Sequence, residues 1–459
     1  MTATPETQPT ATRASFADAF AVYLRPRVLI VLLLGFSSGL PLALSGSTLL
    51  VWMTESGVNL GTIGLFALVG TPYTLKFLWA PVADAIDVPY LSRWLGRRRG
   101  WLVFSQLLLM AAIVFLALGD PRAAPFTIAL GAMLVATASA TQDIVVDAFR
   151  VESLPEREQA AGMAGYVAAY RIGMLVSTAG ALFLVSYFEQ SVGVSKSTAW
   201  MWGYLAMGLL VLIGTAAALI ATEPERSAVA MAAHKGQDAL TRVAKAAIGA
   251  LSEFLSYKLA LVALAFVILF KFTDALSGTM TAPFVIDLGF SRNEYAAIIK
   301  GVGLAALLLG GFAGGFVARA YPLATSLWIG GILQALANLA FSWQAVVGVN
   351  AAWLTFAITV ENFTSAIGTV IFVAYLSALC RNPLHTATQY ALLTALAAVG
   401  RTYLSSGAGF IAAATGWTWF FVICALAGIP SLVLLWWLQK SGHFERLETK
   451  NNTSFRDGA

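Results

Sequence analysis

The string ATQDIVVDAFR, from residue 140 to residue 150, places two carboxylates in a stretch that is otherwise apolar from Phe126 onward. Asp143 and Asp147 are four residues apart, so on an α-helix they project from one face about one turn apart, and Gln142 borders that face. An ionised carboxylate inside a membrane helix disfavours insertion by about 2.5–3.5 kcal/mol. A cost of this size indicates a function, and removal of water from a carboxylate disfavours its charged form, which would suit proton exchange.

Other ionisable side chains also lie inside apolar stretches. Lys271 and Asp274 are three residues apart, so they can pair on one helical face. Glu361, followed by Asn362, falls about a dozen residues from the end of its stretch and therefore near the middle of a membrane. Each of these groups has a structural alternative, namely an internal pair or a hydrogen bond that holds two helices together.

Two arginines, Arg171 and Arg401, also lie inside apolar stretches. A guanidinium does not readily lose its proton, so in a membrane it must face protein, water or an anion. They could bind the carboxylates of an anionic substrate or serve as gate residues held against carboxylates such as Asp84 and Asp147.

The elements that position these residues follow from composition. Of the 459 residues, 59% are hydrophobic and 11% are charged, whereas a soluble domain has about 25% charged residues. Apolar stretches of at least 19 residues recur along the chain, and each can cross a bilayer as a helix. We therefore predict an all-α membrane protein with twelve spans, at residues 28–53, 59–83, 101–119, 124–148, 160–188, 199–221, 257–286, 293–319, 322–342, 349–380, 385–413 and 416–439.

Lysine and arginine predict the orientation. With the amino terminus in the cytoplasm, most of the 28 basic residues fall on the cytoplasmic side, and only Arg122, Lys196 and Arg292 fall in outer loops. Both termini are then cytoplasmic. The predicted organisation is a tail at 1–27, a six-helix bundle at 28–221, a basic amphipathic linker at 222–256, a second bundle at 257–439 and a tail at 440–459.

The two bundles repeat weakly, at an offset near 230 residues. The string ALSG at 43–46 recurs at 275–278, and Arg171 of the fifth span matches Arg401 of the eleventh. Two matches in helices of the same rank favour duplication, as in carriers built from parallel repeats.

Several functions find no support in the sequence. Cys380 and Cys424 lie in separate apolar segments, and the three histidines are scattered, so we expect neither a disulfide nor a metal site. There is no Gly-rich phosphate loop and no nucleotide-binding domain, so we expect no enzyme and no cofactor, and an ion gradient should supply the energy. The net charge of +5 does not suggest a nucleic-acid partner, because in a membrane protein the distribution of the charge matters more than its sum.

The loop after the second span, FLWAPVADAIDVPYLSRWLGRRRGW, resembles the loop between helices 2 and 3 of the major facilitator superfamily. There an aspartate and a basic run latch the two halves together on the cytoplasmic side. The resemblance implies a gating role for Asp84, Arg97 and Arg98. Here about a dozen residues separate Asp84 from Arg97, and the alternative is a positively charged anchor without a gating role.

Further motifs narrow the resemblance to the AmpG family of muropeptide permeases. They are GFSSGLPLALSGSTLLVWM, GLFALVGTPYTLKFLWAP, SATQDIVVDAFR, ENFTSAIGTVIFVAYLSALC and TATQYALLTALAAVGR, which cover most of residues 28–410. The family implies proton-driven import of anhydromuropeptides, which are N-acetylglucosaminyl-anhydro-N-acetylmuramic acid with or without a stem peptide. The family motif SQDIVxDA matches at Gln142, Asp143 and Asp147. Some members have additional carboxy-terminal helices, whereas this chain ends after twelve predicted spans.

Site residues are then expected in three groups. Proton coupling is assigned to Asp143, Asp274 and Glu361. Substrate binding is assigned to Ser38, Ser45, Gln142, Tyr170, Arg171, Lys271, Asn362 and Arg401. Gating is assigned to Asp84, Arg97, Arg98, Asp147 and Arg150, where Asp147 pairs with Arg150 or a loop arginine because the helix runs inward and places it closer to the cytoplasm than Asp143.

We expect a monomer in the bacterial inner membrane whose partners are the anhydromuropeptide, protons and the lipid bilayer. One alternative keeps the carrier fold and changes the cargo to another anionic solute, such as an acetyl-coenzyme A-like molecule. A second alternative is a membrane sensor that binds cell-wall fragments without transporting them.

Overall fold

The computed structural model describes residues 22–224, 259–379, 386–445 and 447, without the side chains of residues 81, 84, 85, 156, 157, 159–161 and 386–392. These residues form helices and turns, with no β-strand among them. Ten helical segments within this part are long and apolar enough to cross a membrane. Most of the two predicted tails and of the predicted 222–256 linker lie outside the described residues.

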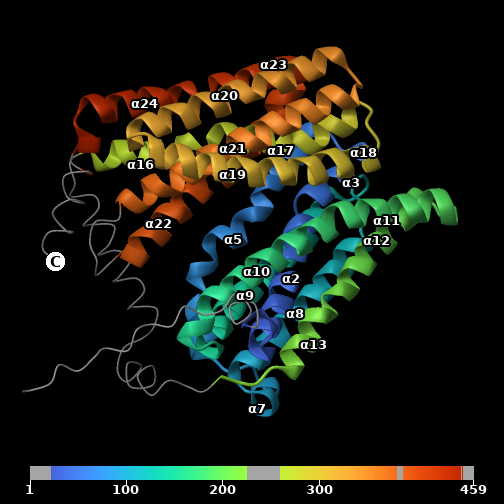
Figure 1. Ribbon diagram of the computed structural model, residues 1–459. Coiled ribbons are helices and arrows are strands. Elements are labelled where there is room, and N and C mark those ends of the chain that lie inside the picture. Colours follow the sequence, from blue (N-terminus) through green and yellow to red (C-terminus); the bar gives the residue numbers. More distant parts are fainter. Residues whose placement is uncertain (1–21, 225–258, 380–385, 446, 448–459) are drawn as a thin grey trace, which may run out of the picture.

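The first half forms one bundle, drawn from blue to green in Figure 1. Its elements are η1 (Val22–Leu24), α2 (Pro26–Leu44), α3 (Ser47–Glu55), α4 (Leu60–Leu65), η2 (Phe66–Gly70), α5 (Thr71–Leu75), η3 (Lys76–Leu78), α6 (Ala80–Ala85), α7 (Leu91–Leu95), α8 (Arg97–Ala117), α9 (Pro125–Ser153), α10 (Glu156–Leu175), η4 (Val176–Gly180), α11 (Ala181–Tyr187), η5 (Phe188–Val192), α12 (Lys196–Leu210) and α13 (Leu212–Ile220).

The second half forms the other bundle, drawn from yellow to red. Its elements are α16 (Ala260–Phe270), α17 (Phe272–Asp287), α18 (Arg292–Tyr295), η6 (Ala296–Val302), α19 (Gly303–Ala320), α20 (Leu323–Val347), α21 (Ala351–Leu379), α22 (Thr386–Val399), η7 (Gly400–Leu404), η8 (Ser405–Gly407), α23 (Ala408–Leu426) and α24 (Ile429–Lys440).

Two features reconcile the ten long segments with the twelve predicted spans. The predicted span 59–83 is a chain of short helices from α4 to α6, in which Pro72 and Pro81 each begin a new segment because proline cannot donate the helical hydrogen bond. The segment Leu393–Lys440 contains two spans. They meet at Gly416. Its φ of 73° is a left-handed conformation that glycine adopts readily and that is strained for other residues.

The long glycine-rich spans are mostly interrupted. The first breaks at Ser45–Gly46, the fifth contains the π-helical turn η4, and the seventh breaks at Lys271. The tenth, α21, runs without a break over 29 residues. The repeated ALSG string lies at the break of the first span and inside α17 in the seventh, so the two copies differ in local geometry.

Helices within a half pack closely where glycine permits it. A Cβ added to Gly39 of α2 would lie 2.0 Å from the carbonyl oxygen of Tyr170 in α10. The backbones of α2 and α10 are therefore in direct contact, which fixes the position of the helix that carries Ser38 relative to the helix that carries Tyr170 and Arg171.

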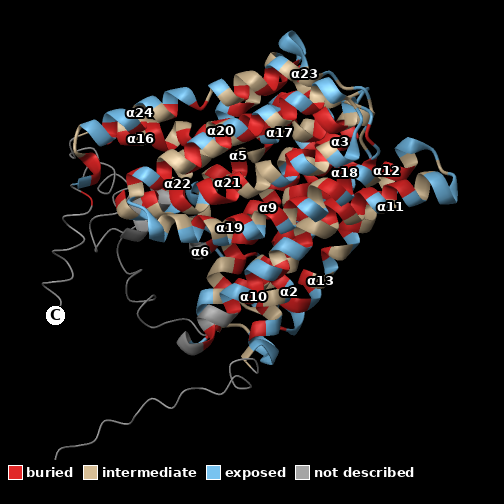
Figure 2. Ribbon diagram, turned by 45° about the horizontal axis from the view of Figure 1, so that its top comes forward, coloured by how far each residue is buried: buried red, intermediate tan, exposed pale blue. Residues whose placement is uncertain are grey.

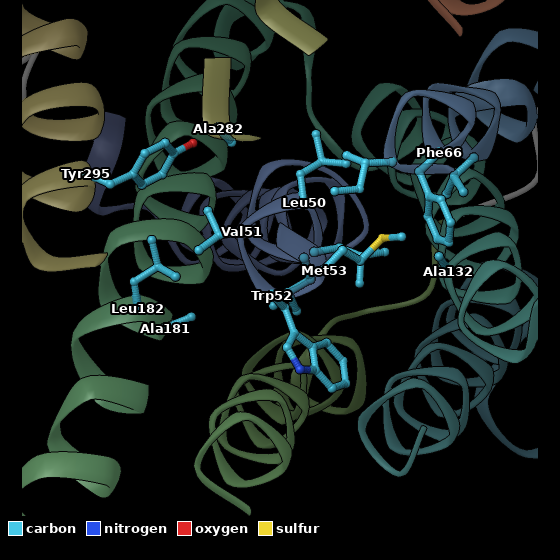
Figure 3. Close-up of a cluster of buried hydrophobic side chains, with 14 of the residues drawn as sticks. Leu50, Val51, Trp52, Met53, Phe66, Ala132, Ala181, Leu182, Ala282 and Tyr295 are labelled. Carbon is cyan, nitrogen blue, oxygen red and sulfur yellow. The ribbon is translucent and has the colours of Figure 1, made fainter. Parts of the chain in front are cut away.

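The two halves touch at one end and separate toward the other (Figure 1). One buried apolar cluster contains residues of both halves, including Trp52 and Met53 of α3 together with Ala282 and Tyr295 (Figure 3). We call this the Arg292 end. At the opposite end, which we call the Arg98 end, each half has a core of its own, with Val31 and Phe149 in one and Phe266 and Leu435 in the other.

Apolar side chains are also exposed on the outer faces of both bundles. Figure 2 shows exposed residues along α24, where Val433, Trp436 and Trp437 each leave about half of their surface uncovered. A water-soluble protein would bury such a surface, whereas a bilayer solvates it. The chain is a multi-pass membrane protein.

Candidate functional site

Two adjoining cavities lie in the interior. One, of about 380 Å³, is lined by Tyr73 and Thr74 of the first half and by Asp274, Thr279 and Arg401 of the second. The other, of about 370 Å³, continues along the second half, and both are lined by Asp274 and Arg401. The first cavity therefore lies between the halves and the second lies within the second half, and the walls of both contain charged residues.

A hydrogen-bonded charge cluster forms the wall of the second half. The break between α16 and α17 places Lys271 at the last residue before α17, and its Nζ lies 2.5 Å from Asp274 Oδ2. The same Nζ donates to Thr369 Oγ1 at 3.0 Å, and Ser365 Oγ donates to Asp274 Oδ2 at 2.7 Å. The pair that the spacing predicts is present, and α21 supplies two hydroxyls that hold it.

Arg401 is the exposed cation of the site. It lies in the π-helical turn η7 and lines both cavities. In the described part of the chain, its guanidinium has neither an ion pair nor a hydrogen bond. Arg171, its counterpart in the repeat, is also exposed but lines neither of the two cavities, so the structure separates two residues that the sequence treats as equivalent.

The motif residues of α9 form a second polar group inside the first half. Gln142 and Ser38 are fully buried, and Gln142 Nε2 donates to Ser38 Oγ at 3.2 Å. Asp143 is 7% exposed, and its Oδ1 has no hydrogen-bond partner among the described atoms. A buried carboxylate oxygen without a partner is costly, which agrees with the cost inferred from sequence.

Asp147 has a different environment. Its side chain is 50% exposed and its Oδ1 lies 3.8 Å from Arg150 NH2. One helical turn thus separates a buried carboxylate from an exposed one that has a basic neighbour, and the two aspartates of the motif are not equivalent in the structure.

The remaining predicted binding residues lie around these groups. Asn362 Nδ2 donates to Glu361 Oε2 at 2.9 Å and to the carbonyl of Ile358 at 3.0 Å. Ser45 is buried and donates to the carbonyl of Pro41 at 2.9 Å. Tyr170 is half-buried, with its ring centroid 6.0 Å from that of Tyr166. None of Ser45, Tyr170, Glu361 and Asn362 lines the two cavities described above.

The predicted gate arginines pair within the first half. Arg98 is 4% exposed, and its NH2 lies 2.5 Å from Glu152 Oε1 at the end of α9. Arg97 NH2 lies 3.5 Å from the same oxygen. Glu223 accepts hydrogen bonds from the backbone N–H groups of Arg98 and Arg99 and so caps α8. The side chain of Asp84 lies outside the described residues.

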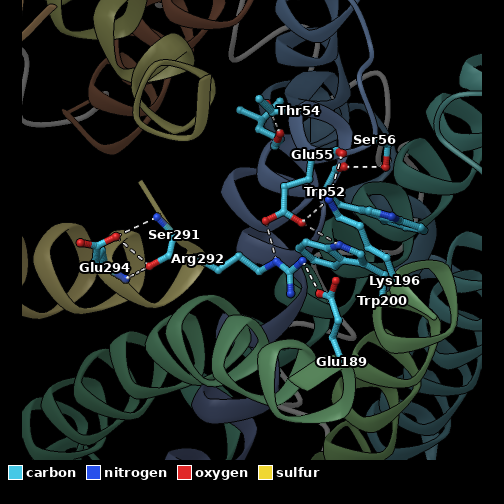
Figure 4. A network of polar contacts seen from close by, with 11 residues as sticks. Trp52, Thr54, Glu55, Ser56, Glu189, Lys196, Trp200, Ser291, Arg292 and Glu294 are labelled. Carbon is cyan, nitrogen blue, oxygen red and sulfur yellow. Dashed lines mark hydrogen bonds and ion pairs between the residues drawn. The ribbon is translucent and has the colours of Figure 1, made fainter. Parts of the chain in front are cut away.

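A charged network at the Arg292 end joins the two halves, and the sequence reasoning missed it (Figure 4). Arg292 of α18 contacts Glu55 of α3, with Nε 2.6 Å from Oε1, and Glu189 of η5, with NH2 2.6 Å from Oε2. Lys196 Nζ and Trp200 Nε1 approach Glu55 Oε2 at 3.6 Å and 3.2 Å. The available signal was that Arg292 is one of three basic residues predicted in outer loops, against the general distribution.

The fold and this site agree with the comparisons. Residues 31–403 match the family described as Major Facilitator Superfamily, and the chain belongs to that superfamily. Solved structures of a D-xylose-proton symporter and of a POT family transporter in complex with 5-aminolevulinic acid superpose on it with TM-scores of 0.64 and 0.67. They share 14% and 12% sequence identity and cover 90% of this chain, with 97% and 96% of their own chains aligned, so they establish the fold.

Within the superfamily the chain belongs to the AmpG family. It is 37% identical to the anhydromuropeptide permease of Escherichia coli strain K12 over 415 residues, which are 90% of this chain and 80% of that protein. It is 34% identical to the putative transporter AmpG 4 of Rickettsia felis, over 90% of this chain and 97% of that protein.

Proposed function

We propose that the protein is a secondary transporter that imports anhydromuropeptides from the periplasm to the cytoplasm by alternating access. The observation that carries this proposal is a cavity between two halves that share a buried core at one end only, with Asp274 and the exposed Arg401 in its wall. The 37% identical relative is an anhydromuropeptide permease, which supplies the class of substrate.

The distribution of lysine and arginine supports an orientation. The Arg98 end would face the cytoplasm together with both termini, and the Arg292 end would face the periplasm across the bacterial inner membrane. In this orientation the conformation is closed toward the periplasm, and the halves diverge toward the cytoplasm.

The cavity chemistry suits the substrate. An anhydromuropeptide carries carboxylates on its lactyl and peptide parts, and Arg401 can bind one of them with two parallel hydrogen bonds. Hydroxyls of Thr74, Ser365 and Thr369 are placed to meet sugar and amide groups. Arg171 would meet the substrate only if the halves move, because it lies outside the two cavities.

Inward proton flow would supply the energy. Of the three carboxylates assigned to coupling, Asp274 already holds Lys271 and Ser365, whereas Asp143 has no ion pair in the described part. We therefore assign the coupling proton first to Asp143. Glu361, which also forms no ion pair within the described residues, is the second candidate. Proton binding at Asp143 would remove the cost of a buried charge and permit the halves to rearrange.

The test is uptake of labelled anhydromuropeptide into proteoliposomes with and without an inward proton gradient. Uptake that increases with the gradient supports proton-coupled import. Equal uptake with and without the gradient would refute proton coupling but would remain consistent with a transporter. Binding without exchange across the membrane would favour a sensor, and displacement by a nucleotide-containing ligand but not by an anhydro-sugar would favour a different cargo.

A further inference from the structure

The two cavities share Asp274 and Arg401 but differ in which half of the protein forms their walls. The first cavity is lined by residues of both halves, including Tyr73 and Thr74 of the first half. The described residues that line the second cavity all belong to the second half, and several of them lie along α21. A ligand that fills both cavities therefore has one part between the halves and another part inside the second half.

The wall of the first cavity combines hydroxyls, a glycine and an aromatic side chain. Thr279 and Ser405 donate their hydroxyl hydrogens to backbone carbonyls four residues earlier, so each oxygen keeps lone pairs that can accept from a ligand hydroxyl. Gly278 is exposed, with nothing within 4 Å of the position where a Cβ would be. Tyr73 is the aromatic residue among those that line this cavity. Acceptors for hydroxyl groups, open space and an aromatic ring suit a sugar.

The second cavity has the more positive wall. Lys271 and Arg401 line it together with Asp274, whereas of these three only Arg401 and Asp274 line the first cavity. Lys271 Nζ donates to Asp274 Oδ2 at 2.5 Å and to Thr369 Oγ1 at 3.0 Å. An ammonium has three hydrogens, so one remains for a ligand. A ligand part that carries carboxylates is therefore better accommodated in the second cavity than in the first.

The face of α21 in the second cavity is long enough for a peptide. Ser365, Thr369, Val373 and Leu376 line the cavity at spacings of three or four residues, so they share one face of the helix. At about 1.5 Å per residue this face extends over about 16 Å, which is the length of about four to five extended peptide residues. Hydroxyls lie at one end of the face, beside Lys271, and apolar side chains lie at the other.

We propose that the two cavities divide an anhydromuropeptide between them: the first binds the disaccharide and the second binds the stem peptide, with Arg401 at the junction. The disaccharide is common to all anhydromuropeptides and then contacts both halves, as a ligand must if it favours closure of the halves around it. The stem peptide adds carboxylates of its own and lies beside Lys271. Its length can vary because its cavity lies within one half. This assignment rests on the transport function proposed above.

The test compares two ligands in equilibrium binding to the purified protein: the disaccharide without a peptide, and the same disaccharide with a tripeptide. Val373→Trp fills the second cavity from an exposed position. It should weaken binding of the peptide-bearing ligand by about tenfold or more and leave the disaccharide unchanged. Gly278→Phe fills the first cavity and should weaken both ligands. Gly315→Phe, at an exposed glycine of α19 that lines neither cavity, is the matched control and should bind both as the wild type does.

Two smaller substitutions test the division independently of whether the larger ones fold. Thr369→Val should weaken the peptide-bearing ligand alone, and Thr279→Val should weaken both, each by about fivefold for one hydrogen bond. Thr359→Val, at an exposed threonine of α21 outside both cavities, is the control.

Loss of the disaccharide in the variants of the second cavity, or loss of the peptide-bearing ligand alone in those of the first, would overturn the division and leave the transport function standing. Failure of the wild type to bind either ligand would count against the transport function itself, and the division would fall with it.

Discussion

Arg292 Nε lies 2.6 Å from Glu55 Oε1, and the two residues belong to opposite halves of the protein. Glu55 ends α3 and Arg292 begins α18, so the contact lies at the rim of the Arg292 end. Both side chains are close to 90% buried. Removal of one partner of such a pair costs about 3–5 kcal/mol, because the other charge remains buried. The pair therefore stabilises the conformation in which this end is closed.

Arg292→Gln should shift the protein toward conformations that are open at the Arg292 end. Spin labels at Ser195 of the first half and Asn350 of the second would report this as a longer distance, with the closed population reduced by about tenfold or more, since 1.4 kcal/mol is a factor of ten. Glu189→Gln should have a smaller effect, because the Glu189 side chain is 32% exposed and exposed pairs contribute about 0–1 kcal/mol. Arg122→Gln is the control, and identical distance distributions in all three variants would exclude a latch.

Alanine should have different effects at two glycines. A Cβ on Gly39 would lie 2.0 Å from a carbonyl of the same half, and a Cβ on Gly409 would lie 1.8 Å from the carbonyl of Leu60 in the other half. Gly39→Ala should lower thermal stability, because α2 and α10 cannot separate without unpacking the bundle. Gly409→Ala should leave stability nearly unchanged and disfavour closure of the Arg292 end. Equal destabilisation by both, measured by thermal unfolding, would contradict separate movement of the halves.

Arg401→Gln should reduce substrate affinity by about tenfold or more, because a bidentate guanidinium–carboxylate contact is lost. Arg401→Lys should recover only part of this affinity, since an ammonium cannot form the planar two-bond contact. Arg171→Gln should affect affinity less, because Arg171 lines neither cavity. The measurement is equilibrium binding to purified protein, and a larger loss at Arg171 than at Arg401 would reverse the assignment.

Asp143→Asn should remove the dependence of uptake on the proton gradient while substrate exchange continues. The reason is that Asp143 is buried without an ion pair in the described part, so its charge state is costly and its protonation can be coupled to movement. Asp147→Asn should slow uptake and retain the gradient dependence, because that side chain is half exposed and lies beside Arg150. Retention of the gradient dependence in Asp143→Asn would move the coupling proton to another carboxylate.

Local patterns in the sequence predicted those parts of the site that depend on neighbours along the chain. The Lys271–Asp274 pair follows from a spacing of three on one helix, and the different depths of Asp143 and Asp147 follow from the direction of one span. The boundary near residue 416 between the last two spans also follows from local composition, and Gly416 provides the turn.

Contacts between distant segments could not be predicted in this way. Arg97 and Arg98 are expected to take part in a latch between the halves, which stays a prediction; among the described contacts both pair with Glu152 of the first half, 54 or 55 positions away in the sequence. Arg171 and Arg401 have the same rank in the repeat, yet only Arg401 lines the two cavities, a difference that depends on tertiary packing and not on local sequence. No pattern in the chain indicated that Glu55 and Glu189 share Arg292.

The sequence by itself determined the membrane class, the number of spans and the family, because apolar length and short motifs are local properties of the chain. The tertiary structure decided which charges meet and which end of the cavity is closed. The physical reason is that an ion pair such as Arg292–Glu55 joins residues 237 positions apart. Its formation depends on how two already folded bundles are placed against each other.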